Sequence, residues 1–264
     1  ISYNSRDVKE NTLFVCKGAH FKKEYLKSSL ELGASVYVSE EKYTDEADYI
    51  IVSDIRRAIA LIANLYYENI WNKLNLIGIT GTKGKSTTAY FIKYILDEYL
   101  SSENKALSGI ISSIDTYDGV SLEESHLTTP EQFELQKHFY NAVSCDISHL
   151  TMEVSSQALK YDRVFGINYK VGCFLNIGSD HISDVEHPDE EDYFYSKMLL
   201  FSQTENAVVN LDCKRADEAL EFSKKCKNTI TFSIKNKNAD VYGYNIRKAG
   251  NDTAFTVKTK DFEE

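Results

Sequence analysis

The sequence predicts an α/β protein in two parts. A small amino-terminal α/β domain is expected over residues 1–72, and a larger domain over residues 73–264, whose mostly parallel sheet opens on a glycine-rich loop and ends in an antiparallel extension. Three observations support this: strand-like and helix-like segments alternate, an apolar run leads directly into a glycine loop, and the last segment alternates apolar and polar residues. A chain of 264 residues is long enough for about two domains.

The segments before residue 73 form a compact alternation of short strands and helices. Their apolar spacing predicts, in order, a strand over 11–16, a helix over 22–32, strands over 34–39 and 49–52, and a helix over 55–67. The last helix repeats its apolar residues at helical spacing, at Ile55, Ile59, Ile62, Ala63 and Tyr66. Residues 68–73 are the expected exit from this domain.

From residue 74 onward the strands and helices alternate on a larger scale. An apolar strand is predicted over 74–80 and a helix over 86–100, with Phe91, Ile92, Ile95 and Leu96 on one face. Further buried strands are predicted over 110–114, 147–154, 171–177 and 207–211. Strands that alternate with helices favour a mostly parallel sheet covered on both faces, whereas residues 241–260 have the period of two expected of antiparallel strands.

Composition excludes several classes of function. The net charge of -10 argues against a nucleic-acid partner, which needs a basic face. No apolar run approaches the roughly 18 residues of a membrane helix, so no membrane insertion is expected. The five cysteines are scattered without a C-x-x-C pair, which favours small core residues in a reducing cytoplasm over a zinc site or disulfides. Because the chain begins at Ile1 rather than Met, we expect that it has been trimmed. We also expect the protein to be a monomer.

The glycine loop is the first functional signal. In the stretch GITGTKGKST, a buried strand is followed by a glycine turn and then by Lys85 and Ser86 opening a helix, an arrangement that directs backbone N–H groups at a phosphate. Lys85 would reach the β- and γ-phosphates and Ser86 would bind Mg²⁺. The pattern departs from the strict P-loop, because Ile79 stands where the first glycine is required. A ligand-free glycine turn is the alternative. We expect an ATP or GTP site formed by Gly81, Thr82, Lys83, Gly84, Lys85, Ser86 and Thr87.

The departure from the strict pattern is itself informative. The sequence T-G-T-x-G-K-S-T after a strand resembles the ATP loop of the Mur ligase family, which makes amide bonds through acyl phosphates. Further segments resemble its UDP-N-acetylmuramoyl-tripeptide synthetases in the same order along the chain. These are SR at Ser5, HLTTPE at 126–131, EVSSQ at 153–157, NIGSDH at 176–181 and YFYSKMLLF at 193–201. Each has a simpler reading alone: T-T-P-E is also a good helix start, and Lys197 could be a surface lysine.

The resemblance implies roles for particular residues. Asn176 would lie near the nucleotide, and Ser5, Thr128, Thr129, Ser155 and Arg163 would contact the UDP-MurNAc-dipeptide, with Ser5 at the uridine end. One Mg²⁺ would be held by Ser86 and Glu153, and another by His181 and Lys197. Lys197 matches the lysine that the family carbamylates with CO₂, a modification that burial favours by lowering the pKa of the amine. Lys85, His181 and Lys197 are therefore the implied catalytic residues.

The resemblance also implies a reaction. ATP would phosphorylate the D-Glu carboxylate of UDP-MurNAc-L-Ala-D-Glu, and the amine of an incoming amino acid would displace the phosphate, as a step of peptidoglycan precursor synthesis. The E-H-P segment at Glu186 favours lysine over diaminopimelate as the added amino acid. Family members carry a third, carboxy-terminal domain not contained in this sequence, so we expect the chain alone to be inactive. A folylpolyglutamate synthetase and a non-catalytic nucleotide-binding paralogue are the alternatives.

Overall fold

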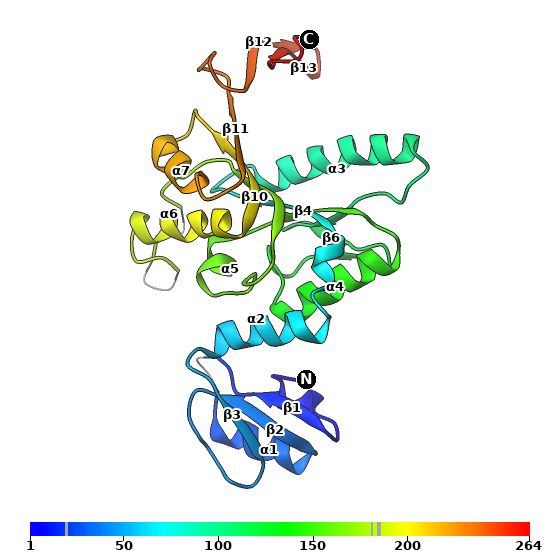
Figure 1. The fold of residues 1–264 in the computed structure, drawn as a ribbon, viewed down its shortest axis with the longest axis vertical. Helices are drawn as coiled ribbons and strands as arrows, with labels where there is room; N and C mark the ends of the chain where they lie inside the picture. Colours follow the sequence, from blue (N-terminus) through cyan, green and yellow to red (C-terminus); the bar gives the residue numbers. More distant parts are fainter. Residues whose placement is uncertain (19–20, 181, 184–185) are drawn as a thin grey trace.

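Two sheets organise the computed structural model, which describes residues 1–18, 21–180, 182–183 and 186–264. The small sheet belongs to the amino-terminal unit and the large sheet to the rest of the chain. Figure 1 shows the amino-terminal unit at one end of the long axis and the carboxyl terminus at the other. The two-part α/β architecture predicted from the alternation of segments is confirmed, whereas the domain boundary at residues 72/73 stays a prediction.

The amino-terminal unit is a three-stranded parallel sheet, in the order β1-β2-β3, with helices packed on it. Its elements are η1 (Ser5–Asp7), β1 (Thr12–Val15), α1 (Lys23–Glu31), β2 (Ala34–Ser39), β3 (Asp48–Ile51) and α2 (Ile55–Tyr66). The helix α2 begins where Asp54 accepts hydrogen bonds from the backbone N–H groups of Arg56 and Arg57. One side of the sheet packs Phe14 and Tyr37 against α1, and the other packs Val15 and Val38 against α2.

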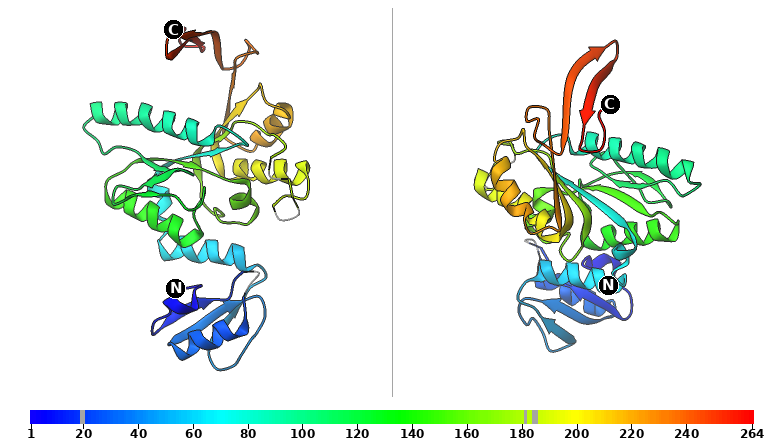
Figure 2. Two further views of the ribbon diagram at one scale, coloured as in Figure 1. Left: turned by 180° about the vertical axis from the view of Figure 1, so that it is seen from behind. Right: turned by 45° about the horizontal axis from the view of Figure 1, so that its top comes forward.

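The large sheet has the strand order β13-β12-β11-β10-β9-β4-β8-β5-β6-β7 in the described residues. It is parallel from β12 to β5 and antiparallel at both edges. Its strands are β4 (Asn75–Thr80), β5 (Gly109–Ile111), β6 (Asp115–Tyr117), β7 (Leu122–Glu124), β8 (His149–Glu153), β9 (Tyr169–Phe174), β10 (Thr204–Asn210), β11 (Asn228–Ser233), β12 (Val241–Ala249) and β13 (Asp252–Lys258). The β12–β13 hairpin is the predicted antiparallel extension and projects away from the other strands (Figure 2).

Helices cover both faces of the large sheet. They are η2 (Ile70–Lys73), α3 (Lys85–Ser102), α4 (Gln132–Ser144), α5 (Ser156–Lys160), α6 (Glu190–Met198), η3 (Leu199–Gln203) and α7 (Ala216–Ser223). Ala89 of α3 packs on one face, together with Ile79 and Cys173. The other face is covered by α4 and α5 over β8 and by α6 and α7 over β10. None of the described helices has the length and apolar character required to cross a membrane.

Two sequence predictions were wrong in detail. The expected apolar face of α3 is only partly covered, because Phe91 and Ile95 are 65% and 70% exposed whereas Ile92 and Leu96 are half-buried. Successive helix residues are about 100° apart, so the sheet covers the side of this face that carries Ile92 and leaves the side with Phe91 exposed. The strand expected over 110–114 ends at Ile111, because the chain turns at residues 112–114 into β6. The β6–β7 hairpin and β11 were not predicted.

Candidate active site

A small cavity of about 190 Å³ lies beyond the carboxyl ends of β4 and β8, where open parallel sheets bind ligands. Its walls come from the loop before α3, the segment before α4, the first turn of α5, and α6. Residues predicted from sequence that line it are Lys85, Thr128, Thr129, Ser155, Arg163 and Lys197. These residues are up to 112 positions apart in the chain (197 − 85), so the parallel sheet brings them together.

The loop from β4 to α3 needs glycine for its shape. Gly81 has φ +155° and a Cβ there would lie 3.0 Å from the Leu175 Cβ, while Gly84 has φ +87° in the left-handed region. The Asn176 side chain braces the loop from the neighbouring strand end. Its Oδ1 accepts hydrogen bonds from the N–H groups of Thr82 (3.0 Å) and Lys83 (2.9 Å). Asn176 therefore shapes the loop in addition to any contact with a nucleotide.

Two lysines converge on one backbone carbonyl of this loop. Lys85 Nζ donates to the Gly81 carbonyl oxygen at 3.0 Å, and Lys197 Nζ donates to the same oxygen at 3.1 Å. Burial lowers the pKa of Lys85, although the Glu153 carboxylate opposes this. Burial and, secondarily, repulsion from Lys85 lower the pKa of Lys197 to about 7. Lys197 is only 2% exposed, so a substantial fraction of its amine is neutral at physiological pH.

The Glu153 carboxylate lies at the end of β8 and is 1% exposed. Its Oε1 accepts hydrogen bonds from the Ser113 N–H (2.8 Å) and the Ser113 hydroxyl (3.2 Å). The Ser113 hydroxyl lies 3.1 Å from that of Ser86, which connects the carboxylate to the start of α3. Sequence analysis missed Ser113, because a serine in a turn carries no motif. Ser113 can reach Glu153 because β5 ends at Ile111 and the chain turns directly after it.

The predicted substrate residues line one wall of the cavity. Thr129 Oγ1 is buried between the Glu153 carbonyl oxygen and the Ser155 N–H, both at 3.0 Å, and the Ser155 hydroxyl caps α5. Arg163 donates to the Thr129 carbonyl oxygen at 3.3 Å. Its Nε lies 3.0 Å from Glu131 Oε1, so a carboxylate holds the guanidinium at the cavity wall.

The same Glu131 ties the site to the amino-terminal unit. Its second oxygen lies 2.7 Å from Lys17 Nζ, and Lys17 in turn sits 4.5 Å from the centre of the Tyr3 ring. This link between the two parts of the chain was not predicted, because Glu131 looked like an ordinary first-turn residue of a helix. Ser5 lies nearby in sequence in η1 but is not among the residues that line the cavity.

The structure describes three of the four predicted metal ligands, which are Ser86, Glu153 and Lys197. His181 lies outside the described residues. Among the residues that the structure describes, no three or more His, Cys, Asp or Glu side chains form a group suited to a metal ion. The Glu153 carboxylate with the Ser113 and Ser86 hydroxyls nevertheless forms a set of hard oxygen donors, the kind that Mg²⁺ prefers.

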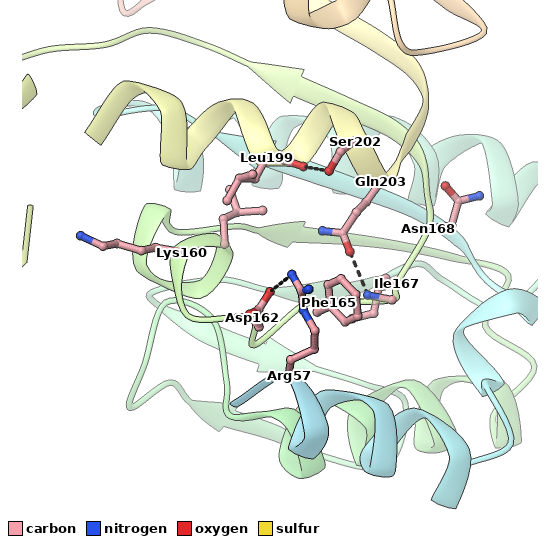
Figure 3. Close-up of a pocket in the computed structure, with 11 residues that line it drawn as sticks. Arg57, Lys160, Asp162, Phe165, Ile167, Asn168, Leu199, Ser202 and Gln203 are labelled. Carbon is pink, nitrogen blue, oxygen red and sulfur yellow. Dashed lines mark hydrogen bonds and ion pairs between the residues drawn. The ribbon is translucent and has the colours of Figure 1, made fainter. Parts of the chain in front are cut away.

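A larger cavity of about 480 Å³ is lined in part by Leu159 and Lys160, the last residues of α5 (Figure 3). Arg57 of α2 reaches Asp162 at 3.7 Å there and stacks over the Phe165 ring at 4.3 Å. Gln203 accepts a hydrogen bond from the Gly166 N–H at 2.9 Å. None of the predicted site residues lines this cavity, so size does not identify the chemical centre of the molecule.

Comparison with known proteins identifies the family of this chain. The family model of the Mur ligase middle domain matches residues 79–264. UDP-N-acetylmuramoyl-L-alanyl-D-glutamate--L-lysine ligase of Streptococcus agalactiae serotype V is 46% identical over 210 residues, which are 80% of this chain and 42% of that protein. The protein of the same name from Streptococcus thermophilus is 40% identical over 263 residues, 95% of this chain and 54% of that one. The chain thus spans about half the length of the curated relatives it matches.

A solved structure supports the fold. The structure of a UDP-N-acetylmuramoyl-L-alanyl-D-glutamate--2,6-diaminopimelate ligase aligns with a TM-score of 0.83, covering 100% of this chain and 54% of that one. At 20% sequence identity this similarity concerns the fold alone.

Proposed function

The chain belongs to the Mur ligase family, and we propose that the protein containing it is an ATP-dependent ligase that adds L-lysine, in preference to meso-diaminopimelate, to UDP-MurNAc-L-Ala-D-Glu in peptidoglycan precursor synthesis. The convergence of Lys85 and Lys197 on the Gly81 carbonyl oxygen carries this proposal. Because of this arrangement, the lysine of the phosphate loop, Lys85, lines the same cavity as Arg163 and Lys197. Lys197 is buried and its pKa is lowered to about 7. The 40–46% identity to two proteins named as lysine ligases favours this function over folylpolyglutamate synthesis.

The chemistry requires an activated carboxylate, since a free carboxylate does not react with an amine in neutral water. Transfer of the ATP γ-phosphoryl group to the D-Glu carboxylate gives an acyl phosphate, and attack by the amine then releases phosphate. The first step brings anions together, so cations have to screen them. Lys85 and the backbone N–H groups at the start of α3 are suited to the ATP phosphates, since the N–H groups of Thr82 and Lys83 already donate to Asn176. Arg163 is suited to an anionic group of the UDP-MurNAc-dipeptide. Thr128, Thr129 and Ser155 form the wall beside it.

Glu153, with Ser86 and Ser113, would hold a Mg²⁺ ion, because these residues supply carboxylate and hydroxyl oxygens. When bound, the ion would neutralise charge on the ATP phosphates. The proposed second ion would use His181, which lies outside the described residues, and Lys197. Asn176 and Ser5 keep their proposed roles at the nucleotide and at the uridine.

Lys197 fits this second role only after modification. As an ammonium it would repel both Lys85 and a metal ion, whereas reaction of the neutral amine with CO₂ gives an anionic carbamate. Burial supplies the neutral amine, since the pKa of Lys197 is lowered to about 7. We therefore propose carbamylation of Lys197. Cytoplasmic location and a monomeric state remain predictions.

The test is the reaction itself. The complete gene product is incubated with ATP, Mg²⁺ and UDP-MurNAc-L-Ala-D-Glu, and with lysine, diaminopimelate or ornithine in separate reactions. Phosphate release is followed and the product is weighed by mass spectrometry. We expect the mass of the lysine adduct. Absence of any adduct, although ATP still binds, would favour the non-catalytic paralogue.

A further inference from the structure

A chain of hydrogen bonds leads from the small cavity into the interior of the protein. Ser156, which lines the cavity, has its Oγ 2.9 Å from His187 Nε2. The other ring nitrogen of His187, Nδ1, lies 2.5 Å from Asp192 Oδ2. The His187 side chain is 0% exposed, and the Ser156 hydroxyl gives it a hydrogen-bonded connection to the cavity. A hydroxyl, an imidazole and a carboxylate in this order form the arrangement that moves protons in hydrolases.

The direction of each hydrogen bond follows from the carboxylate. Burial alone would raise the pKa of Asp192, but hydrogen bonds from Lys160 (2.6 Å) and His187 lower it, so the group is ionised. A carboxylate only accepts hydrogen bonds, and the ring proton of His187 therefore sits on Nδ1. In the neutral imidazole Nε2 is then an acceptor, and the Ser156 hydroxyl donates to it. The Ser156 oxygen then still has acceptor capacity, and Ser156 lines the cavity.

The other charged or titratable groups around His187 come from the elements packed against it. Tyr193 of α6 has its ring centre 4.9 Å from that of the imidazole, and Glu186 precedes His187 in the chain. Lys160 of α5 reaches Asp192 and the Glu186 carbonyl oxygen. Lys160 Nζ and His187 Nδ1 therefore both lie against Asp192 Oδ2, at 2.6 and 2.5 Å, and share this carboxylate.

We infer that Ser156 and His187 carry away the proton of the incoming amine, an inference that rests on the proposed function. The amine nitrogen bonds to the acyl carbon, and the bond from that carbon to the phosphate oxygen breaks, so that inorganic phosphate leaves. The nitrogen passes one proton to Ser156 Oγ as Ser156 passes its own proton to His187 Nε2. The imidazolium is held by Asp192 and returns its proton to water after the product leaves. Ser156 contacts the reacting amine, and His187 acts through Ser156.

The inference separates the two halves of the reaction. Formation of the acyl phosphate needs no base, because the carboxylate is already ionised, whereas the amine step does. In the complete enzyme, S156A and H187Q should lower kcat for the lysine adduct about 100-fold, the low end for loss of a general base. Single-turnover formation of ADP without amino acid should stay within about twofold of wild type, as should KM for UDP-MurNAc-L-Ala-D-Glu. S156T keeps the hydroxyl and should recover most of the lost activity.

A second buried histidine provides the matched control. His138 pairs with Asp118 at 2.8 Å, is 4% exposed against 0% for His187, and lines a separate cavity rather than the small one. H138Q should leave both half-reactions unchanged. Retention of kcat by S156A, or an equal loss of both half-reactions in S156A and H187Q, would overturn the inference. Failure of the proposed function gives a different result, because the wild-type enzyme would then form no adduct at all.

Discussion

The two cavities that α5 lines differ in the chemistry of their walls as well as in size. The first turn of α5 lines the small one and its last residues line the large one. The small cavity of about 190 Å³ is bounded by the buried Lys197 and the half-buried Lys85, and burial lowers the pKa of both lysines. The large cavity of about 480 Å³ has a half-exposed ion pair, Arg57 with Asp162.

This difference in lining residues indicates which of the two cavities is the reaction site. Burying a charge is costly unless it is paired or neutralised, so groups such as Lys197 persist where they serve a function. A half-exposed ion pair costs little and stabilises little. Substitutions at the small cavity should therefore have large effects on activity, and substitutions at the large cavity small ones.

The largest effect is expected from Lys197→Met in the complete enzyme. Loss of the group that becomes the carbamate should lower ligase activity about 100-fold or more, because charge stabilisation at the reacting phosphate is lost. Intact-mass measurement should show the added mass of one CO₂ in wild type and none in the variant. Lys170→Met, at a half-exposed lysine paired with Glu205, is the control and should keep full activity. Activity above a tenth of wild type in Lys197→Met would contradict the assignment.

The pH dependence of stability should report the buried amine directly. The pKa of Lys197 is lowered from 10.5 to about 7, so between these values the unfolded chain binds a proton that the folded protein has released. The free energy of unfolding should therefore rise with pH between about 7 and 10.5, by a few kcal/mol. Denaturant titrations in CO₂-depleted buffer measure this slope, and comparison with Lys197→Met isolates it. Equal slopes in the two proteins would mean that the folded lysine keeps its proton.

A smaller effect is expected at the loop brace. Asn176→Ala removes the acceptor for the N–H groups of Thr82 and Lys83, which leaves the phosphate loop less ordered before ATP binds. Loss of such hydrogen bonds costs about 1–3 kcal/mol, so the Kd for ATP should rise about tenfold. Calorimetric titration with ATP and Mg²⁺ measures it. Asn206→Ala, which removes a side-chain hydrogen bond on the exposed end of β10, should leave ATP binding unchanged.

The smallest effect is expected at the large cavity. Arg57→Ala removes a 3.7 Å ion pair whose arginine side chain is 54% exposed, and should change the free energy of unfolding by about 1 kcal/mol or less. Ligase activity should be unchanged. A clear loss of activity, measured as adduct formation, would show that the large cavity takes part in the reaction and would remove the contrast between the two sites.

The sequence by itself determined the alternation of elements and the residues of the phosphate loop. Both ends of the strand over 34–39 were predicted correctly. The strand is rich in β-branched and aromatic residues, and it is bounded by a glycine before it and by a charged turn after it. Lys85, Glu153 and Lys197 were recognised because each stands in a local motif next to a strand or helix end. Motifs of this kind consist of a few consecutive residues, so they can be recognised without the structure.

Only the tertiary structure decided how distant residues meet. Ser113 reaches Glu153 across 40 residues, Glu131 joins Lys17 to Arg163, and His187 lies between Ser156 and Asp192. His187 and Asp192 are only five positions apart, but the other pairings have no fixed spacing in sequence. Crossovers of a parallel sheet bring strand ends together at lengths set by the intervening helices. The buried face of α3 was likewise decided by the sheet beneath it, since its sequence offers two apolar stripes and the fold covers one.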